Sequence, residues 1–237
     1  MKYSTEEVVK EKFDIIISVG QPDICDPTEY TDGGYMSDPD ILRMTAVGLS
    51  ACRKDEHGDA YPDFALCFAR RYKRERLAPD RKILLIRTFV DMFSDKPRQT
   101  VDVSDENNAF DTALSFNKNN RIVAVLWFGR VCYDSGNGDK HIGDLYYSAL
   151  SALTEEFRNT AKRDCPVIFG CMPCDEDKKN SATRDAVYAA IEKLCRDTTR
   201  AAFADTKGIG LNCEKTGFGN MTSSDRRVAE LLGDRYY

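Results

Sequence analysis

The sequence predicts an α/β fold, in which a mostly parallel β-sheet carries α-helices on both faces. Short apolar runs alternate along the chain with longer segments of helical periodicity, which is typical of parallel sheets with right-handed crossover helices. The runs at 13–19 and 81–89 are mostly apolar, as in strands that are buried on both faces. The 237 residues show no repeat, low-complexity tract or linker, so we expect one domain over residues 1–237.

Five apolar runs are expected to form the sheet. The first, "FDIIISV" at 13–19, ends at a glycine and is followed by polar residues. A shorter run, "DILRMTAV" at 40–47, is a weaker strand candidate. The five predicted strands are 13–19, 81–89, 121–129, 165–171 and 207–213.

Segments of helical periodicity separate and follow these strands. In them, apolar residues recur three and four positions apart, as on the buried face of an amphipathic helix. The clearest case is 143–163, with Tyr146, Leu150, Leu153 and Phe157. The predicted helices are 62–77, 106–118, 143–163, 183–203 and 223–237.

The composition of the chain argues against some classes of binding partner. The net charge is −5, which disfavours a nucleic-acid binder, because such proteins need a basic face. The basic run "RRYKRER" at 70–76 has helical spacing and is interpreted as a solvated helix face. No apolar stretch approaches the roughly 20 residues that a membrane-spanning helix needs, so no membrane partner is expected.

The opening segment and the cysteines predict where the protein works. "MKYSTEEVVKEKF" is charged and lacks the apolar core of a secretory signal. The nine cysteines are scattered through predicted strands and helices, as reduced, buried thiols are. We therefore expect a cytoplasmic protein or a particle assembled inside the cell, such as a virion, and no secretion by a signal peptide.

Several segments carry, in order, a likeness to a known family. "GQPD" (20–23) resembles its GQSN block, and "VAVLWFGRVCYD" (123–134) resembles its strand ending in W-x-Q-G-E. The closing "SSDRRVAELLGDRYY" (223–237) resembles the tail after its catalytic D-x-x-H. That family is the sialate O-acetylesterase-like group of carbohydrate esterases in the SGNH/GDSL hydrolase superfamily. The resemblance implies a flavodoxin-like, three-layer α/β/α sandwich with a mostly parallel five-stranded sheet.

The positions that match the family's catalytic blocks have lost the residues that ester hydrolysis needs. Such enzymes use a serine nucleophile and a histidine base. Here the serine position is Pro22, the aspartate position is Gly217 and the histidine position is Asn220. Trp127 is retained, but "GRV" at 129–131 replaces Gln-Gly-Glu. We therefore predict no catalytic residue, and the candidate ligand-binding residues are Gln21, Asp23, Trp127, Arg130 and Asn220.

Two residues could take part in catalysis, so an active enzyme is the alternative prediction. Cys25 lies three residues after Pro22, and a cysteine beside a base is a competent nucleophile. His141 lies in a loop after the strand at 121–129, whereas the second histidine, His57, precedes the first long helix. The alternative function is a carbohydrate O-acetylesterase with relocated or thiol-based catalytic residues.

The sequence predicts neither a metal nor a cofactor. The acidic residues of the loop 23–32 lack the spacing of a calcium motif. Cys171 and Cys174 of "CMPC" would need two further ligands to hold zinc, and no glycine-rich phosphate-binding motif follows a strand.

The leading prediction is a catalytically inactive, SGNH-hydrolase-like protein. A fold that has lost its catalytic residues persists as a scaffold or a binding surface. We therefore expect a structural or interaction subunit of a larger assembly, such as a virus particle or multi-subunit complex. Its expected partners are other protein subunits, with glycan as a further candidate ligand of the old pocket.

Overall fold

A computed structural model describes residues 9–20, 38–45, 48–51, 64–88, 112–129, 141–161, 164–171, 181–206, 209 and 226–237 of the chain. At its centre lies a seven-stranded sheet with the order β3-β2-β4-β1-β5-β6-β7. Neighbouring strands are parallel except β2 and β3, which are antiparallel. The strands are β1 (Phe13–Gly20), β2 (Ile41–Thr45), β3 (Gly48–Ala51), β4 (Lys82–Thr88), β5 (Arg121–Gly129), β6 (Val167–Cys171) and β7 (Ala201–Phe203).

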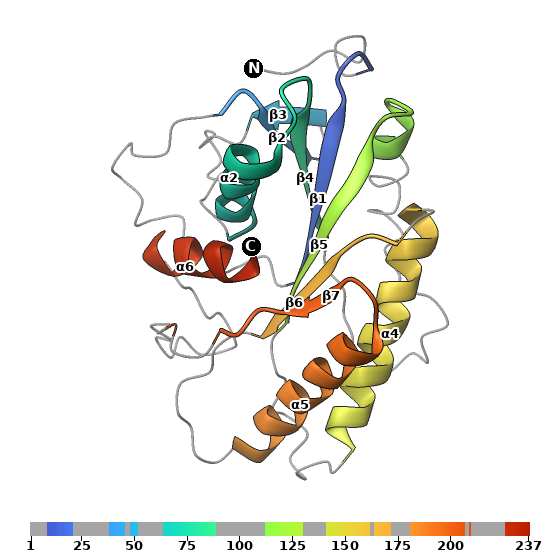
Figure 1. The fold of residues 1–237 in the computed structure, drawn as a ribbon, viewed down its shortest axis with the longest axis vertical. Helices are drawn as coiled ribbons and strands as arrows, with labels where there is room; N and C mark the ends of the chain where they lie inside the picture. The colour runs from blue at the N-terminus through green and yellow to red at the C-terminus, as the bar shows by residue number, and fades with distance from the viewer. Residues whose placement is uncertain are drawn as a thin grey trace.

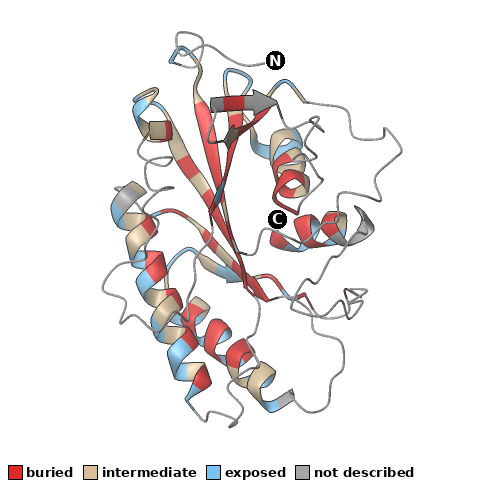
Figure 2. Ribbon diagram, turned by 180° about the vertical axis from the view of Figure 1, so that it is seen from behind, coloured by how far each residue is buried: buried red, intermediate tan, exposed pale blue. Residues whose placement is uncertain are grey.

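Helices cover both faces of the sheet, which confirms the predicted three-layer sandwich (Figure 1). α2 (Phe64–Arg76) and α6 (Arg226–Tyr236) pack together on one face. α4 (Ile142–Ala161) and α5 (Ser181–Asp197) pack together on the other. Figure 2 shows buried positions along the central strands and on the inner sides of the helices, with exposed positions on the outer sides.

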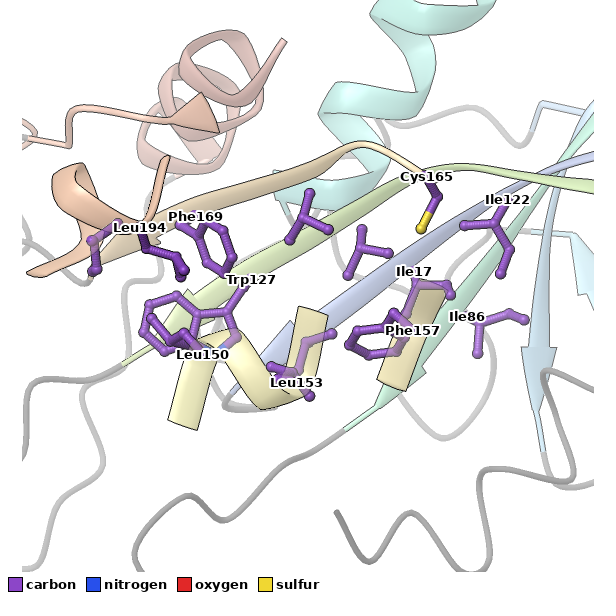
Figure 3. Close-up of a cluster of buried hydrophobic side chains, with 14 of the residues drawn as sticks. Ile17, Ile86, Ile122, Trp127, Leu150, Leu153, Phe157, Cys165, Phe169 and Leu194 are labelled. Atoms are coloured by element: carbon purple, nitrogen blue, oxygen red, sulfur yellow. The ribbon is translucent and has the colours of Figure 1, made fainter. Parts of the chain in front are cut away.

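Each face of the sheet has its own apolar core. Along β1, Ile15, Ile17 and Val19 face α4 and α5, whereas Ile16 faces α2 and α6. These side chains are at most 1% exposed, and full burial stabilises the fold by about 1.5–3 kcal/mol for each. Figure 3 shows the core on the α4 side, to which α4 contributes Leu150, Leu153 and Phe157, three of the residues whose spacing predicted this helix.

β5 contains one extra residue relative to β1. Ile15 pairs with Ile122 and Ile16 pairs with Ala124, so Val123 has no partner of its own on β1. Ile122 faces the α4 side, whereas Val123 and Ala124 both pack on the α2 side. This irregularity is a β-bulge, in which two residues of one strand oppose one residue of its neighbour.

The sheet has seven strands, and the expectation of five was too low. The weaker candidate at 40–47 forms β2, and β3 adds an antiparallel edge. β7 lies inside the segment 183–203, which was predicted to be helical throughout. α5 instead ends at Asp197, and the chain turns at Arg200, whose φ is 51°. The β-branched Thr198 and Thr199 between them favour the end of the helix.

Two further predicted elements lie partly outside the described residues. In the predicted strand 207–213, Ile209 is described and is not in a strand, and the other residues lie outside. In the predicted helix 106–118, residues 112–115 are helical and 106–111 lie outside.

The C-terminal helix meets α2 at a glycine. A Cβ at Gly233 would lie 2.4 Å from the Cβ of Cys67 and 2.9 Å from the backbone nitrogen of Phe68. Beside this contact, Arg71 pairs with Asp234 at 3.0 Å and lies over the ring of Tyr237, 4.5 Å from its centroid. The tail that carried part of the family resemblance therefore packs α6 against α2.

Candidate functional site

The parallel strands end along one edge of the sheet, which we name the carboxyl edge. It is defined by Gly20, Thr88, Gly129 and Cys171, the last residues of β1, β4, β5 and β6. Ligands of open α/β sheets bind beyond this edge. In the sequence, positions 21–23 directly follow β1 and position 130 directly follows β5. The predicted site residues Gln21, Pro22, Asp23, Arg130, Gly217 and Asn220 lie outside the described residues, as does Cys25.

Trp127 is the predicted site residue that the described part of the chain includes. Its side chain is 3% exposed and belongs to the core on the α4 side. Its indole lies 6.2 Å from the ring of Phe169 at an interplanar angle of 59°. A Cβ at Gly129 would lie 2.0 Å from the indole, so the absence of a side chain at Gly129 lets the ring lie over the last residue of β5. Trp127 is thus a core residue that extends toward the carboxyl edge.

Tyr236 of α6 fixes the end of β5 from the opposite face. Its hydroxyl donates a 2.6 Å hydrogen bond to the carbonyl oxygen of Trp127. A Cβ at Gly170 would lie 2.3 Å from this hydroxyl, so glycine is needed where the tyrosine crosses β6. Burial, followed by the neighbouring Cys171 and Tyr188, raises the pKa of Tyr236 well above 10.0. Sequence reasoning assigned this residue no role, although the tail pattern that contains it was part of the resemblance.

A second buried hydrogen-bond chain fixes the end of β6. Thr206 donates to the carbonyl oxygen of Cys171 at 2.6 Å. The hydroxyl of Tyr188, on α5, lies 3.3 Å from that of Thr206. Thr206 is fully buried, and buried hydroxyls of this kind stabilise the fold when they are paired.

Thr88 differs from these paired hydroxyls. It is the last residue of β4 and is 4% exposed. Its Oγ1 is buried and has no hydrogen-bond partner in the part of the chain that the structure describes. Thr88 therefore places an unpaired polar atom at the carboxyl edge, and the sequence pattern, which shows only a polar residue at the end of an apolar run, did not single it out.

His141 lies at the start of α4, which follows β5. Its side chain is 83% exposed, and its Nδ1 lies 3.9 Å from Oδ2 of Asp144, which is 89% exposed. This contact is longer than the roughly 2.6–3.2 Å of a hydrogen bond between a nucleophile and its base. His57 lies outside the described residues.

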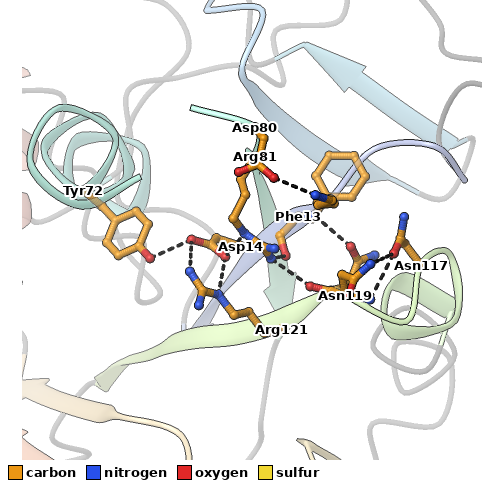
Figure 4. A network of polar contacts seen from close by, with 10 residues as sticks. Phe13, Asp14, Tyr72, Asp80, Arg81, Asn117, Asn119 and Arg121 are labelled. Carbon is orange, nitrogen blue, oxygen red and sulfur yellow. Dashed lines mark hydrogen bonds and ion pairs between the residues drawn. The ribbon is translucent and has the colours of Figure 1, made fainter. Parts of the chain in front are cut away.

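The strongest charge cluster lies at the amino ends of the central strands, away from the carboxyl edge (Figure 4). Asp14 of β1 is fully buried and accepts hydrogen bonds from Arg81 at 2.6 Å, Arg121 at 2.7 Å and Tyr72 at 2.7 Å. Burial alone raises the pKa of Asp14, but the bonds from Arg121, Tyr72 and Arg81 outweigh it and hold the pKa below 3.8. Burial and the same carboxylate raise the pKa of Tyr72 to about 12. The cluster joins α2, β1, β5 and the residue directly before β4 and has a structural role.

The basic run on α2 is largely compensated by acidic side chains. Lys73 contacts Asp38 and Asp40 at 2.7 Å each. Arg71 pairs with Asp234, and Arg74 lies 3.2 Å from Glu75. The interpretation of this run as a solvated helix face agrees with these contacts.

The described cysteines form no disulfide, namely Cys67, Cys165, Cys171 and Cys195. Cys165 precedes β6 and Cys171 ends it, so the two lie at opposite ends of the strand. Among the described residues, no group of three or more His, Cys, Asp or Glu side chains is placed to hold a metal ion. Within the same described residues, no helix has the length and apolar character that crossing a membrane requires.

Comparison with solved structures identifies the fold. NanS matches with a TM-score of 0.68 over 96% of both chains, at 14% sequence identity. A protein from Arabidopsis thaliana matches with a TM-score of 0.62 over 94% of this chain and 97% of its own, at 15% identity. A carbohydrate acetylesterase from Xanthomonas citri matches with a TM-score of 0.61 over 94% of this chain and 55% of its own, at 12% identity. No family model and no curated sequence matches the chain.

These neighbours define the class of fold. The Xanthomonas citri protein is described as a carbohydrate acetylesterase. The chain therefore shares its fold with NanS and with this carbohydrate acetylesterase, in agreement with the fold that the resemblance implied. At sequence identities of 14%, 12% and 15%, the similarity shows that these proteins share a fold and nothing more.

Proposed function

We propose that the protein is a carbohydrate-esterase-like domain that binds acetylated carbohydrate at the carboxyl edge without hydrolysing it. One observation carries the proposal. Residues 204–225, between the end of β7 and the start of α6, contain no histidine, although the family resemblance locates the catalytic base there. Ester hydrolysis by an attacking hydroxyl requires a group that removes its proton, and the chain offers no imidazole in this segment.

The residue at the nucleophile position supports the same proposal. Pro22 is the second residue after the end of β1. Its ring has no hydroxyl, and its nitrogen carries no hydrogen, so it supplies neither a nucleophile nor an oxyanion donor. The adjacent Asp23 accepts hydrogen bonds when ionised and would repel the negative charge that develops on the carbonyl oxygen.

An esterase assay tests the absence of hydrolysis. p-Nitrophenyl acetate and O-acetylated N-acetylneuraminic acid are the substrates, and we expect the same rate as with heat-denatured protein. Pro22→Ser restores a hydroxyl without a base, so this variant is also expected to be inactive. Turnover by the wild type that disappears in Cys25→Ala or His141→Ala, but not in the control Cys195→Ala, would contradict the proposal. That result would favour an active O-acetylesterase with relocated or thiol-based residues.

We further propose that this domain is a subunit of a larger assembly that forms inside the cell, such as a virus particle or a multi-subunit complex. This proposal rests on a general argument: a protein that keeps its fold without the catalytic residues is retained because its surface binds partners. Native mass spectrometry of the protein isolated from its source tests this role. A complex with other protein subunits is expected, and a monomer in every preparation would contradict it.

A further inference from the structure

Three polar residues lie on neighbouring strands on the α2 side of the sheet. Ser18 of β1 pairs with Arg87 of β4. Arg43 of β2 pairs with Leu85, which lies two residues before Arg87 on β4. Leu85 packs on the α2 side, and alternate residues of a strand share a face, so both arginines lie on this side. Ser18 does so too, because it lies two residues after Ile16, which packs there.

This group of residues lies where the apolar core on the α2 side ends. β4 is an inner strand between β2 and β1, and its earlier residues on this face, Ile83 and Leu85, are at most 2% exposed. Arg87, in contrast, is exposed, and Ser18 is half-buried. Arg43 is 8% exposed. A ligand can therefore reach Arg87 and Ser18 from solvent, without an internal cavity.

The two arginines lie close enough to bind one ligand together. Neighbouring strands are about 4.8 Å apart, and two residues along a strand span about 6.6 Å. The Cα atoms of Arg43 and Arg87 are therefore about 8 Å apart, and an anion between the two side chains would offset the repulsion of their like charges. In β1, β2 and β4, the described acidic residue is Asp14, which lies at the amino ends of the strands with the partners given above.

The donors of this group match an oxyanion. A guanidinium group carries five N–H donors in a planar fork, which fits the oxygens of a carboxylate or a phosphate. Each of the two arginines also takes part in a further interaction within the protein, and one such interaction occupies only part of this donor set. The hydroxyl of Ser18 adds one more donor.

We propose that Arg43, Arg87 and Ser18 form a binding site for an oxyanion, which is the carboxylate or phosphate group of a small ligand. Arg87 binds the oxyanion from the solvent side and Arg43 from the side of the core, while Ser18 donates a hydrogen bond to one of its oxygens. This site is independent of the proposed function, because it recognises charge and not an acetyl group.

Two-dimensional NMR of the arginine Nε–Hε groups in the purified full-length chain tests the site. The probes are inorganic phosphate and succinate, with succinamide as the uncharged counterpart of succinate, all at one ionic strength set with sodium chloride. We expect phosphate, succinate or both to shift the Arg87 signal in a saturable way and succinamide to leave it unchanged. The comparison of phosphate with succinate shows which oxyanion the site prefers.

Substitutions then measure what each side chain contributes to binding, followed by the rise in Tm with anion concentration. Arg87→Gln is expected to weaken binding about tenfold or more, because it removes hydrogen bonds from a charged donor. Arg87→Lys keeps the charge without the planar fork and is expected to give a smaller loss. Ser18→Ala is expected to weaken binding by about threefold, the loss of one hydrogen bond.

Arg74→Gln is the matched control, because it changes the net charge by the same amount on the neighbouring α2. The Arg74 side chain is 70% exposed and lies beside Glu75, so this variant is expected to bind the anion as the wild type does. Equal losses in Arg74→Gln and Arg87→Gln would overturn the site, because binding would then follow net charge alone.

Two further results would also overturn the oxyanion site. One is a wild type that binds neither phosphate nor succinate in a saturable way. The other is unchanged binding by Arg87→Gln. Both results leave the proposed carbohydrate binding untouched, since no probe is a carbohydrate or carries an acetyl group.

Discussion

The hydroxyl of Tyr236 lies 2.6 Å from the carbonyl oxygen of Trp127, and this bond joins α6 to β5, one of the strands that end at the carboxyl edge. The bond crosses β6 at Gly170, where a side chain would collide with the tyrosine. The segment that closes the fold is therefore also the segment that fixes the end of β5, from which Arg130 follows in the sequence.

Tyr236→Phe is expected to destabilise the protein without changing its fold. The variant removes a buried hydrogen bond to a carbonyl group, a loss of about 1–2 kcal/mol, which for a chain of this size lowers the Tm by about 4 °C. Thermal unfolding followed by circular dichroism measures the change. Tyr237→Phe is the matched control, because its hydroxyl accepts a longer hydrogen bond of 3.3 Å from Nε of the exposed Arg76. Equal Tm changes in the two variants would refute the role given to Tyr236.

Asp14→Asn is expected to cost about 3 kcal/mol, because it leaves Arg81 and Arg121 without the charge that compensates them. Urea unfolding at pH 7 measures this loss. Asp80→Asn is the control, because Asp80 makes an exposed ion pair with Lys12, and its midpoint is expected to match the wild type. No difference between the two variants would show that the Asp14 cluster is not stabilising.

The cluster around Asp14 predicts that the stability of the protein depends on pH. The pKa of Asp14 in the folded protein is lower than its ordinary value of 3.8, so its contribution to stability is complete above 3.8 and is lost as the pH falls through the lower, folded-state value. The difference in unfolding free energy between wild type and Asp14→Asn is therefore expected to be constant from pH 7 to 5 and to shrink toward pH 3. A difference that already shrinks between pH 7 and 5 would contradict this assignment.

Gly233→Ala is expected to destabilise the contact between α6 and α2. The new Cβ would overlap the Cβ of Cys67 and the backbone of Phe68, and such overpacking costs about 1–3 kcal/mol. Gly143→Ala in α4 is the control, because its nearest contact, the carbonyl oxygen of Ala186, is 3.1 Å away. There the gain in helix propensity, up to about 1 kcal/mol, offsets the tighter contact. Guanidinium unfolding compares the two, and a larger loss in Gly143→Ala would contradict the packing argument.

Cys195 is expected to react slowly with alkylating agents. Burial and then the negative charge of Glu192 raise its pKa to about 11. At pH 8 only a small fraction of this thiol is ionised, which slows the reaction. A thiolate of higher pKa is a stronger nucleophile, which offsets part of this effect. The expected net result is a rate about tenfold below that of a cysteine in a free peptide. Iodoacetamide labelling followed by peptide mass spectrometry measures the rate. A rate equal to that of the peptide would show that the thiol is accessible and ordinary.

The sequence predicted the central strands well, because β1, β4, β5 and β6 are buried on both faces and read as continuous apolar runs. It failed at β7, because the helical periodicity of α5 continues into Ala201–Phe203 and only the conformation of Arg200 reveals the turn between them. It also missed the antiparallel edge strand β3, a run of four residues without a marked apolar pattern.

The candidate site was predictable only in its location. The predicted topology leads us to expect it at the carboxyl edge, and the resemblance predicts which positions depart from the family's catalytic pattern. Tyr236 and Thr88 were not singled out, because a single polar residue at the end of an apolar element has no distinctive sequence pattern. Their environments depend on which backbone groups the fold brings within reach.

The extra residue in β5 has a consequence for how this strand can vary in length. Since Val123 and Ala124 face the same side, deleting Val123 would restore simple alternation and leave Trp127 on its present side. A deletion inside β1 or β4 would instead invert every side chain beyond it. Chimaeras between this chain and other members of its structural class can therefore tolerate a one-residue mismatch at Val123, and a crossover placed there would preserve both cores.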